Sequence, residues 1–199
     1  MGNYVADATW GGQPVQAGVT VYWSGVSVAT WPAEPGPAPY LVEAMLADGV
    51  AAASIKIVVW ASPGSLYQIM RDTCLIGARL DWLAIGASPQ VVWMWHGESA
   101  SNDLALATAY EEDMVQWGCL CDGIWPGVWL QFQELLSESY TYWDTTHASI
   151  RAAIARMAGA EEVASKLPTL LGKADTVHAS SGPGGGTDVA AQRAWALVT

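Results

Sequence analysis

The sequence is poor in phenylalanine, in basic residues and in cysteine. Its 199 residues include one Phe against twelve Trp, and eight Lys and Arg against nineteen Asp and Glu. The formal net charge of −11 argues against a protein that binds the phosphate backbone of nucleic acid, because such binding requires clustered basic side chains. The same charge suits a carbohydrate binder or a component of a larger assembly.

Three cysteines do not make a disulfide framework. Cys119 and Cys121 lie too close for an easy mutual bridge, and Cys74 leaves the number odd. We therefore expect folding in a reducing compartment rather than general secretion, and the chain opens without the basic and apolar segments of a signal peptide. No apolar run reaches the roughly 18–20 residues of a spanning helix, so we expect no membrane insertion.

The length predicts a single domain, residues 1–199. Its N-terminal segment, residues 1–36, is irregular and is predicted to contain a hairpin, in which Ser24-Gly25 separates two runs rich in Val and aromatic residues. Residues 37–199 alternate strand and helix patterns, which predicts an α/β core with a parallel sheet and helices on both faces. The expected strands are Ser54–Trp60, Gln90–Trp95, Trp125–Phe132 and Leu167–Leu171. A short helix is expected to begin at Pro39, and four others are expected over Leu66–Ile85, Asn102–Leu120, Trp143–Met157 and Asp188–Val198.

Polar clusters follow three of these strands. They are Ser62–Ser65, His96–Ser99 and Asp175–His178. Because the carboxyl ends of parallel strands share one edge of a sheet, we expect the three clusters to converge on one site.

The motifs in these clusters resemble those of the SGNH (GDSL-like) hydrolases, in the branch of sialate and carbohydrate O-acetylesterases. Trp95–Ser99 (WHGES) resembles the Gly-Glu-Ser-Asp block, and Asp175–His178 (DTVH) resembles the closing Asp-x-x-His block. Ala61–Leu66 (ASPGSL) is similar to the second, glycine-containing block, and the resemblance covers roughly residues 19–199. It implies a flavodoxin-like, three-layer α/β/α sandwich with a mostly parallel sheet.

The same resemblance assigns roles in ester hydrolysis. His178 would take the proton from a serine, Asp175 would orient the imidazole, and the backbone N–H of Gly64 would hold the oxyanion. Gly97, Glu98 and Ser99 would shape that oxyanion hole. No cofactor is implied, and we expect no metal, since His96, Glu98 and His178 are the one trio of ligands that the sequence offers.

The nucleophile is unknown, because the family's first block (Gly-Asp-Ser or Gly-Gln-Ser-Asn) cannot be found. One alignment places Gly12-Gln13-Pro14 there, with proline replacing serine. Another starts the chain after the block, so that the central first strand is missing. Asn3–Ala8, Val15–Val21 or another chain would then have to fill the gap. The candidate serines for a replacement nucleophile are Ser24, Ser62, Ser65 and Ser99.

These observations favour a catalytically incomplete SGNH-like domain, used as a structural or glycan-binding component of a tailed-phage virion, on a tail, baseplate or head spike. The expected partners are other virion proteins or further copies of the chain, with a host glycan as a candidate ligand. Trp10, Trp23 and Trp31 lie outside the predicted core and suit such contacts. The expected location is the virion, assembled in the host cytoplasm, or else the cytoplasm itself. The alternative function is an active carbohydrate O-acetylesterase that acts on host surface polysaccharide.

Overall fold

Strands and helices alternate along the chain. The computed structural model describes residues 7–62, 66–96, 100, 103–132, 149–155 and 186–196. The helices and strands in these ranges include β1 (Thr20–Trp23), β2 (Val26–Ser27), α1 (Ala38–Ala47), η1 (Ala52–Ser54), β3 (Lys56–Val59), α2 (Tyr67–Ile69), η2 (Met70–Leu75), α3 (Ile76–Ile85), β4 (Val91–Met94), α4 (Leu104–Ile124), β5 (Trp129–Phe132) and α6 (Gly186–Ala196). The protein is therefore of mixed α/β type.

The hairpin is confirmed at the position that the sequence predicts. β1 and β2 pair antiparallel, with Trp23 opposite Val26. Ser24 and Gly25 both have positive φ, 47° and 89°, as a tight hairpin turn requires. The other edge of β1 pairs in parallel with β3, so the hairpin is part of a larger sheet.

The strands form two sheets. One has the order β2-β1-β3, and the other contains β4 and β5, which pair in parallel from Val91 opposite Trp129 to Met94 opposite Phe132. The third parallel strand expected over Trp125–Phe132 is thus present as β5. Within the described residues no backbone hydrogen bond joins β3 to β4, so the continuous parallel sheet that we expected is divided at this point.

The helix expected over Leu66–Ile85 is present but not uniform. α2 leads into the π-helical turn η2, and α3 continues to the left-handed Gly86, with φ 70°. Gly77, which the sequence marks as a weak point, has a packing role: a Cβ atom there would overlap the indole ring of Trp60. The glycine therefore allows the end of β3 to approach the helix closely.

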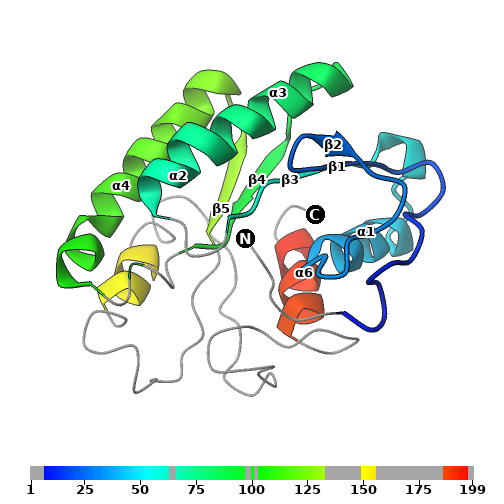
Figure 1. Ribbon diagram of the computed structural model, residues 1–199, viewed down its shortest axis with the longest axis horizontal. Helices are drawn as coiled ribbons and strands as arrows, with labels where there is room; N and C mark the ends of the chain where they lie inside the picture. Colours follow the sequence, from blue (N-terminus) through cyan, green and yellow to red (C-terminus); the bar gives the residue numbers. More distant parts are fainter. Residues whose placement is uncertain are drawn as a thin grey trace.

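The helices lie on both sides of the strands. Figure 1 shows α2, α3 and α4 together on one side, and α1 with α6 on the other. α4 begins at Asp103, whose side chain accepts hydrogen bonds from the N–H groups of Ala105 (2.8 Å) and Leu106 (3.0 Å), the usual geometry of an N-cap. No helix in the described ranges is long and apolar enough to cross a membrane.

The buried apolar side chains form two clusters. The larger joins the helices α2 to α4 with β4 and β5, and the smaller joins β1 with α1. Trp31 belongs to the smaller cluster and is 1% exposed, so the expectation that it lies outside the core is wrong. Its neighbours in the sequence are loop residues, but the loop folds back over β1 and α1. Residues 149–155 are helical, as expected for part of Trp143–Met157, whereas Leu167–Leu171 lies outside the described residues.

Candidate functional site

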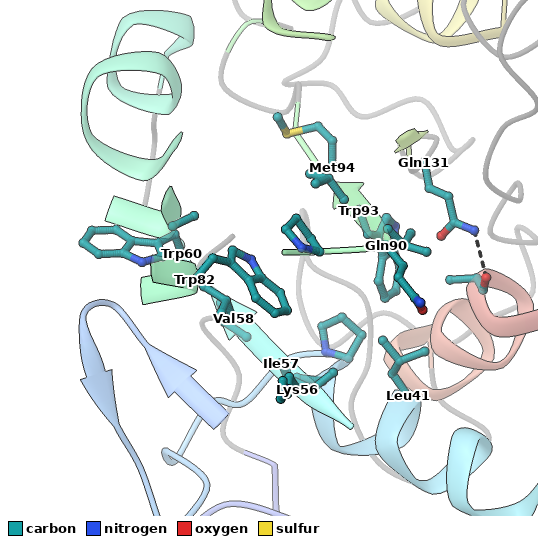
Figure 2. Close-up of a pocket in the computed structure, with 18 of the residues that line it drawn as sticks. Leu41, Lys56, Ile57, Val58, Trp60, Trp82, Gln90, Trp93, Met94 and Gln131 are labelled. Carbon is teal, nitrogen blue, oxygen red and sulfur yellow. Dashed lines mark hydrogen bonds between the residues drawn. The ribbon is translucent and has the colours of Figure 1, made fainter. Parts of the chain in front are cut away.

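A cavity of about 1000 Å³ lies between β3 and β4, where the two sheets fail to meet. We call it the β3–β4 slot. Figure 2 shows Lys56, Ile57 and Val58 of β3 across the slot from Trp93 and Met94 of β4. Both apolar clusters contribute side chains to its walls, among them Trp23, Met45, Val59, Trp60, Met70, Trp82, Val92 and Trp117. The slot is therefore a break in the core as well as in the sheet.

The backbone of β3 presents one unpaired edge to the slot. The carbonyls of Ile55 and Val59 accept hydrogen bonds from β1 and from Ser24, at 3.1 and 2.9 Å. In a strand the N–H and C=O of one residue point to the same side, and this side alternates along the chain. The backbone groups of Lys56 and Val58 consequently point toward the slot.

β4 presents a matching edge. The Gln90 carbonyl accepts a hydrogen bond from the Trp129 N–H at 2.9 Å, so Gln90, Val92 and Met94 face β5. By the same alternation the backbone groups of Val91 and Trp93 point toward the slot. Within the described residues these groups have no backbone partner.

Three indole N–H groups at the slot are buried and unpaired within the described residues. They belong to Trp93, Trp117 and Trp129. Trp93 and Trp95 stack with ring centroids 6.1 Å apart, which confirms that they share one face of the strand. Because the three nitrogens are themselves buried, these residues line the slot with aromatic ring surface rather than with open hydrogen-bond donors.

A hydrogen-bonded cluster fixes the carboxyl end of β3. Asp81 of α3 is 4% exposed. It accepts hydrogen bonds from Trp60 Nε1 at 2.6 Å and from the Gly25 N–H at 3.2 Å. The carboxylate thus ties the hairpin turn and the end of β3 to the helix, and it holds the Trp60 ring against Gly77.

At the carboxyl end of β4 the chain is held by α4. His96 is 6% exposed and stacks on Tyr110 at 5.8 Å, with the rings nearly parallel. The Tyr110 hydroxyl donates to the His96 carbonyl oxygen at 2.8 Å. Burial, and to a smaller extent Glu112, raise the pKa of Asp113 on the same helix, whereas His96 and Arg71 lower it. His96 is therefore a packed residue beside an acidic helix face.

The residues that the SGNH resemblance assigns to catalysis lie outside the described residues. These are Gly64, Gly97, Glu98, Ser99, Asp175 and His178. Their convergence stays a prediction. Two of their neighbours, Ser62 and His96, follow β3 and β4 at the predicted edge, and Ser24 follows β1 at that edge, since its N–H donates to the Val59 carbonyl. Within the described residues, neither serine hydroxyl has a hydrogen bond to a histidine.

The segments considered for the missing strand do not occupy the slot where they are described. Pro14 forms a β-bridge with Thr30, so Gly12-Gln13-Pro14 belongs to the N-terminal segment. Val15–Val21 leads into β1, which lies on the far side of β3. Asn3–Ala8 is described only from Asp7, whose N–H donates to the Ala33 carbonyl at 3.0 Å.

Two features of the slot were missed from the sequence. Trp117 and Trp129 were not distinguished from other core aromatics, although a buried indole N–H usually finds an acceptor and neither of these two has one within the described residues. Gln131 is 1% exposed, and its Nε2 donates to the Ala194 carbonyl of α6 at 2.9 Å. A polar residue inside an apolar strand was the available signal for this contact. No cluster of three or more potential metal ligands occurs in the described parts of the chain.

Comparison with solved structures gives a likeness of fold. An X-ray structure of a protein from Arabidopsis thaliana, at 1.6 Å resolution, superposes with a TM-score of 0.68. The match covers 92% of this chain and 81% of the plant protein, with 16% sequence identity. No protein-family model and no curated protein sequence matches the chain. At this identity the likeness extends to the fold alone.

Proposed function

We propose that this chain is an SGNH-hydrolase-like domain, a flavodoxin-like α/β/α sandwich in which the described strands leave the central, catalytic position open. On this proposal it acts as a structural or glycan-binding component rather than as an enzyme. The observation that carries the proposal is the β3–β4 slot: two parallel strand pairs face each other across a cavity at the position where a central strand would join them.

In the family that the sequence resembles, catalysis depends on the strand at this central position. The nucleophilic serine follows that strand, and without its hydroxyl His178 has no proton to take and the ester carbonyl meets no attacking oxygen. Loss of the nucleophile from such a triad costs on the order of a million-fold in turnover. In the other alignment Pro14 takes the place of the serine; it has no hydroxyl group, and it forms a β-bridge with Thr30.

Exposed apolar side chains on the outer helices support a role in an assembly. Ile76, Leu80 and Leu83 of α3 are 52%, 60% and 66% exposed. They recur at helical spacing along α3, and apolar surface of this kind is common at protein contacts. The proposal also places the chain in a tailed-phage virion. Its partners there would be other virion proteins or further copies of the chain, and its ligand would be a host glycan. This part of the proposal depends on the sequence resemblance.

One observation favours the competing function, an active carbohydrate O-acetylesterase. Ser24 and Ser62 both lie at the edge where the carboxyl ends of β1 and β3 meet. Either hydroxyl would have to reach His178 to serve as nucleophile.

An esterase assay separates the two functions. Hydrolysis of p-nitrophenyl acetate is measured for the purified chain and for His178→Ala, Ser24→Ala and Ser62→Ala. The proposal expects all four proteins to show the same low background. Turnover that falls to background in His178→Ala and in one of the serine variants would establish the esterase and refute the incomplete domain.

A further inference from the structure

We infer that the segment immediately before Asp7, Met1–Ala6, occupies the β3–β4 slot as an extended strand and joins the two sheets into one. This inference goes beyond the proposed function, because it names what fills the central position of the sheet, and it holds whether or not the chain is an enzyme. Met1–Ala6 lies outside the described residues, so the inference depends on the residues that surround the slot.

The two edges of the slot call for a strand. Lys56 and Val58 on one side, and Val91 and Trp93 on the other, turn their N–H and C=O groups toward the slot without a backbone partner within the described residues. Backbone groups inside a fold are nearly always paired. A strand pairs with two facing edges at once, because its own groups alternate between its two sides.

Asp7 fixes the chain beside the slot. This residue is 3% exposed, and its carboxylate accepts hydrogen bonds from the Tyr40 hydroxyl at 2.7 Å and from the N–H groups of Thr9 and Trp10 at 2.8 and 3.1 Å. Its own N–H donates to the Ala33 carbonyl at 3.0 Å. Close neighbours of Tyr40 and Ala33 in the sequence line the slot, namely Pro35, Gly36, Pro37, Ala38 and Leu41. The chain that precedes Asp7 therefore begins close to one wall of the slot.

The direction of the chain also fits. β1 and β3 are parallel, and α1 leads into β3 through η1. In such a connection the helix runs against the strands, so the first turn of α1, which contains Tyr40, lies toward their carboxyl ends. A strand that runs parallel to β3 leaves the slot at that same edge and continues into Asp7. β3 and β4 are connected through α2, η2 and α3, which places them parallel as well.

The segment is long enough to fill the slot. Six extended residues span up to about 20 Å, whereas the four residues of β3 span about 13 Å. A five-residue strand occupies roughly 800 Å³, from a rise of about 3.3 Å per residue, about 4.8 Å between strands and about 10 Å across the side-chain layers. The cavity measures about 1000 Å³.

The side chains of the segment suit the walls. Among the described residues that line the slot, Lys56 has the one charged side chain. Met1–Ala6 (MGNYVA) contains neither a charged side chain nor a proline. Leu167–Leu171, the strand expected elsewhere in the sequence, contains Pro168, and a proline cannot donate to both neighbours of a central strand. The next serine after the segment is Ser24, so the inference agrees with the proposed loss of the nucleophile.

The direct test is a nuclear Overhauser measurement on the full chain labelled with ¹⁵N and ¹³C. Backbone protons of neighbouring strands lie close enough to give strong cross-peaks. Residues 3–6 are expected to show such cross-peaks to Val58 on one side and to Trp93 on the other. Cross-peaks from Val58 and Trp93 to a different segment, such as residues 167–171, would overturn the inference, and so would their absence.

A deletion measures what the segment contributes. In a chain that lacks residues 2–6, amide hydrogen exchange at Val58 and Trp93 is expected to become faster by about tenfold or more. The internal controls are Ile57 and Val92, whose N–H groups face β1 and β5 and should change less. Equal exchange at Val58 and Trp93 with and without the segment would contradict its place in the slot.

Two lysine variants keep the inference testable if the deleted chain does not fold. Val5→Lys places a charge inside the apolar slot and is expected to lower the urea midpoint markedly. The matched control is Ala8→Lys, at an exposed position on the other side of Asp7, which should leave the midpoint unchanged. Equal midpoints for the two variants would mean that Val5 is not buried and would refute the inference. None of these measurements depends on the result of the esterase assay, so the two proposals can fail separately.

Discussion

Replacing Gly77 with alanine tests how closely the end of β3 packs on the helix that follows it. The new methyl group would overlap the Trp60 ring. The ring cannot move aside freely, because Trp60 Nε1 donates to Asp81 at 2.6 Å. Overpacking of this kind costs about 1–3 kcal/mol, and the higher helix propensity of alanine returns about 1 kcal/mol. We therefore expect Gly77→Ala to lower the free energy of unfolding by up to about 2 kcal/mol.

Two other helical glycines provide a graded control for this prediction. A Cβ atom at Gly123 of α4 would meet no atom within 4 Å, and one at Gly118 would lie 3.2 Å from the tip of Leu130. Gly123→Ala is expected to stabilise the chain by about 0.5–1 kcal/mol, and Gly118→Ala is expected to have a smaller effect. Urea unfolding followed by far-ultraviolet circular dichroism measures all three variants.

The order of the three variants decides the outcome. If Gly77→Ala stabilises the chain as much as Gly123→Ala does, the Trp60 ring does not rest on the helix and the packing described here is wrong. A double variant, Gly77→Ala with Trp60→Leu, isolates the contact. The second substitution removes the clash, so the double variant should be less destabilised than the sum of the two single changes.

Three further predictions concern two carboxylates, Asp81 and Asp113, and the thiol of Cys119. Asp81→Ala removes the acceptor of the Trp60 and Gly25 N–H groups and should cost about 0.5–1.5 kcal/mol for each hydrogen bond lost, seen as a lower urea midpoint. Ellman's reagent at pH 8 should label Cys119 rapidly in the folded chain, because this thiol is exposed, and Cys119→Ser should abolish the rapid phase; burial shields the other two thiols and raises the pKa of Cys121 to about 12. Asp113→Asn should raise the melting temperature at neutral pH and leave it unchanged at pH 3. The pKa of this carboxyl is raised in the fold, so its ionisation costs stability as pH rises through that value. Equal shifts at both pH values would contradict the assignment.

Local signals in the sequence were sufficient for single elements. Ser24-Gly25 predicts the hairpin because a tight turn needs residues that tolerate positive φ, and both residues have it. The apolar runs before His96 and after Gly127 predict β4 and β5, since buried parallel strands are continuous in hydrophobicity. These features depend on neighbours in the chain, which the sequence shows directly.

Features that depend on distant contacts were not predictable. The propensities of Met70–Leu75 do not indicate the π-helical turn η2, and the loop sequence around Trp31 does not show that this ring packs with Val21, Val42 and Ile55. Strand patterns also do not say which strand lies next to which, so the division between β3 and β4 was not visible as such. The alignment without a first block predicted only that a central strand would be missing. The predicted catalytic residues, from Gly64 to His178, lie outside the described residues, and their assembly stays a prediction.

The contacts of α6 have a consequence for the two halves of the molecule. Gln131 of β5 donates to the Ala194 carbonyl at 2.9 Å, and the next residue, Trp195, donates through Nε1 to Asp48 at the end of α1 at 2.5 Å. Within the described residues no strand pairing joins the β2-β1-β3 sheet to the β4-β5 sheet, so these two hydrogen bonds of α6 connect β5 with α1 instead. A ligand that moved the two halves apart would strain these two hydrogen bonds first. A change in the amide hydrogen exchange of residues 186–196 would then report binding that takes place elsewhere in the molecule.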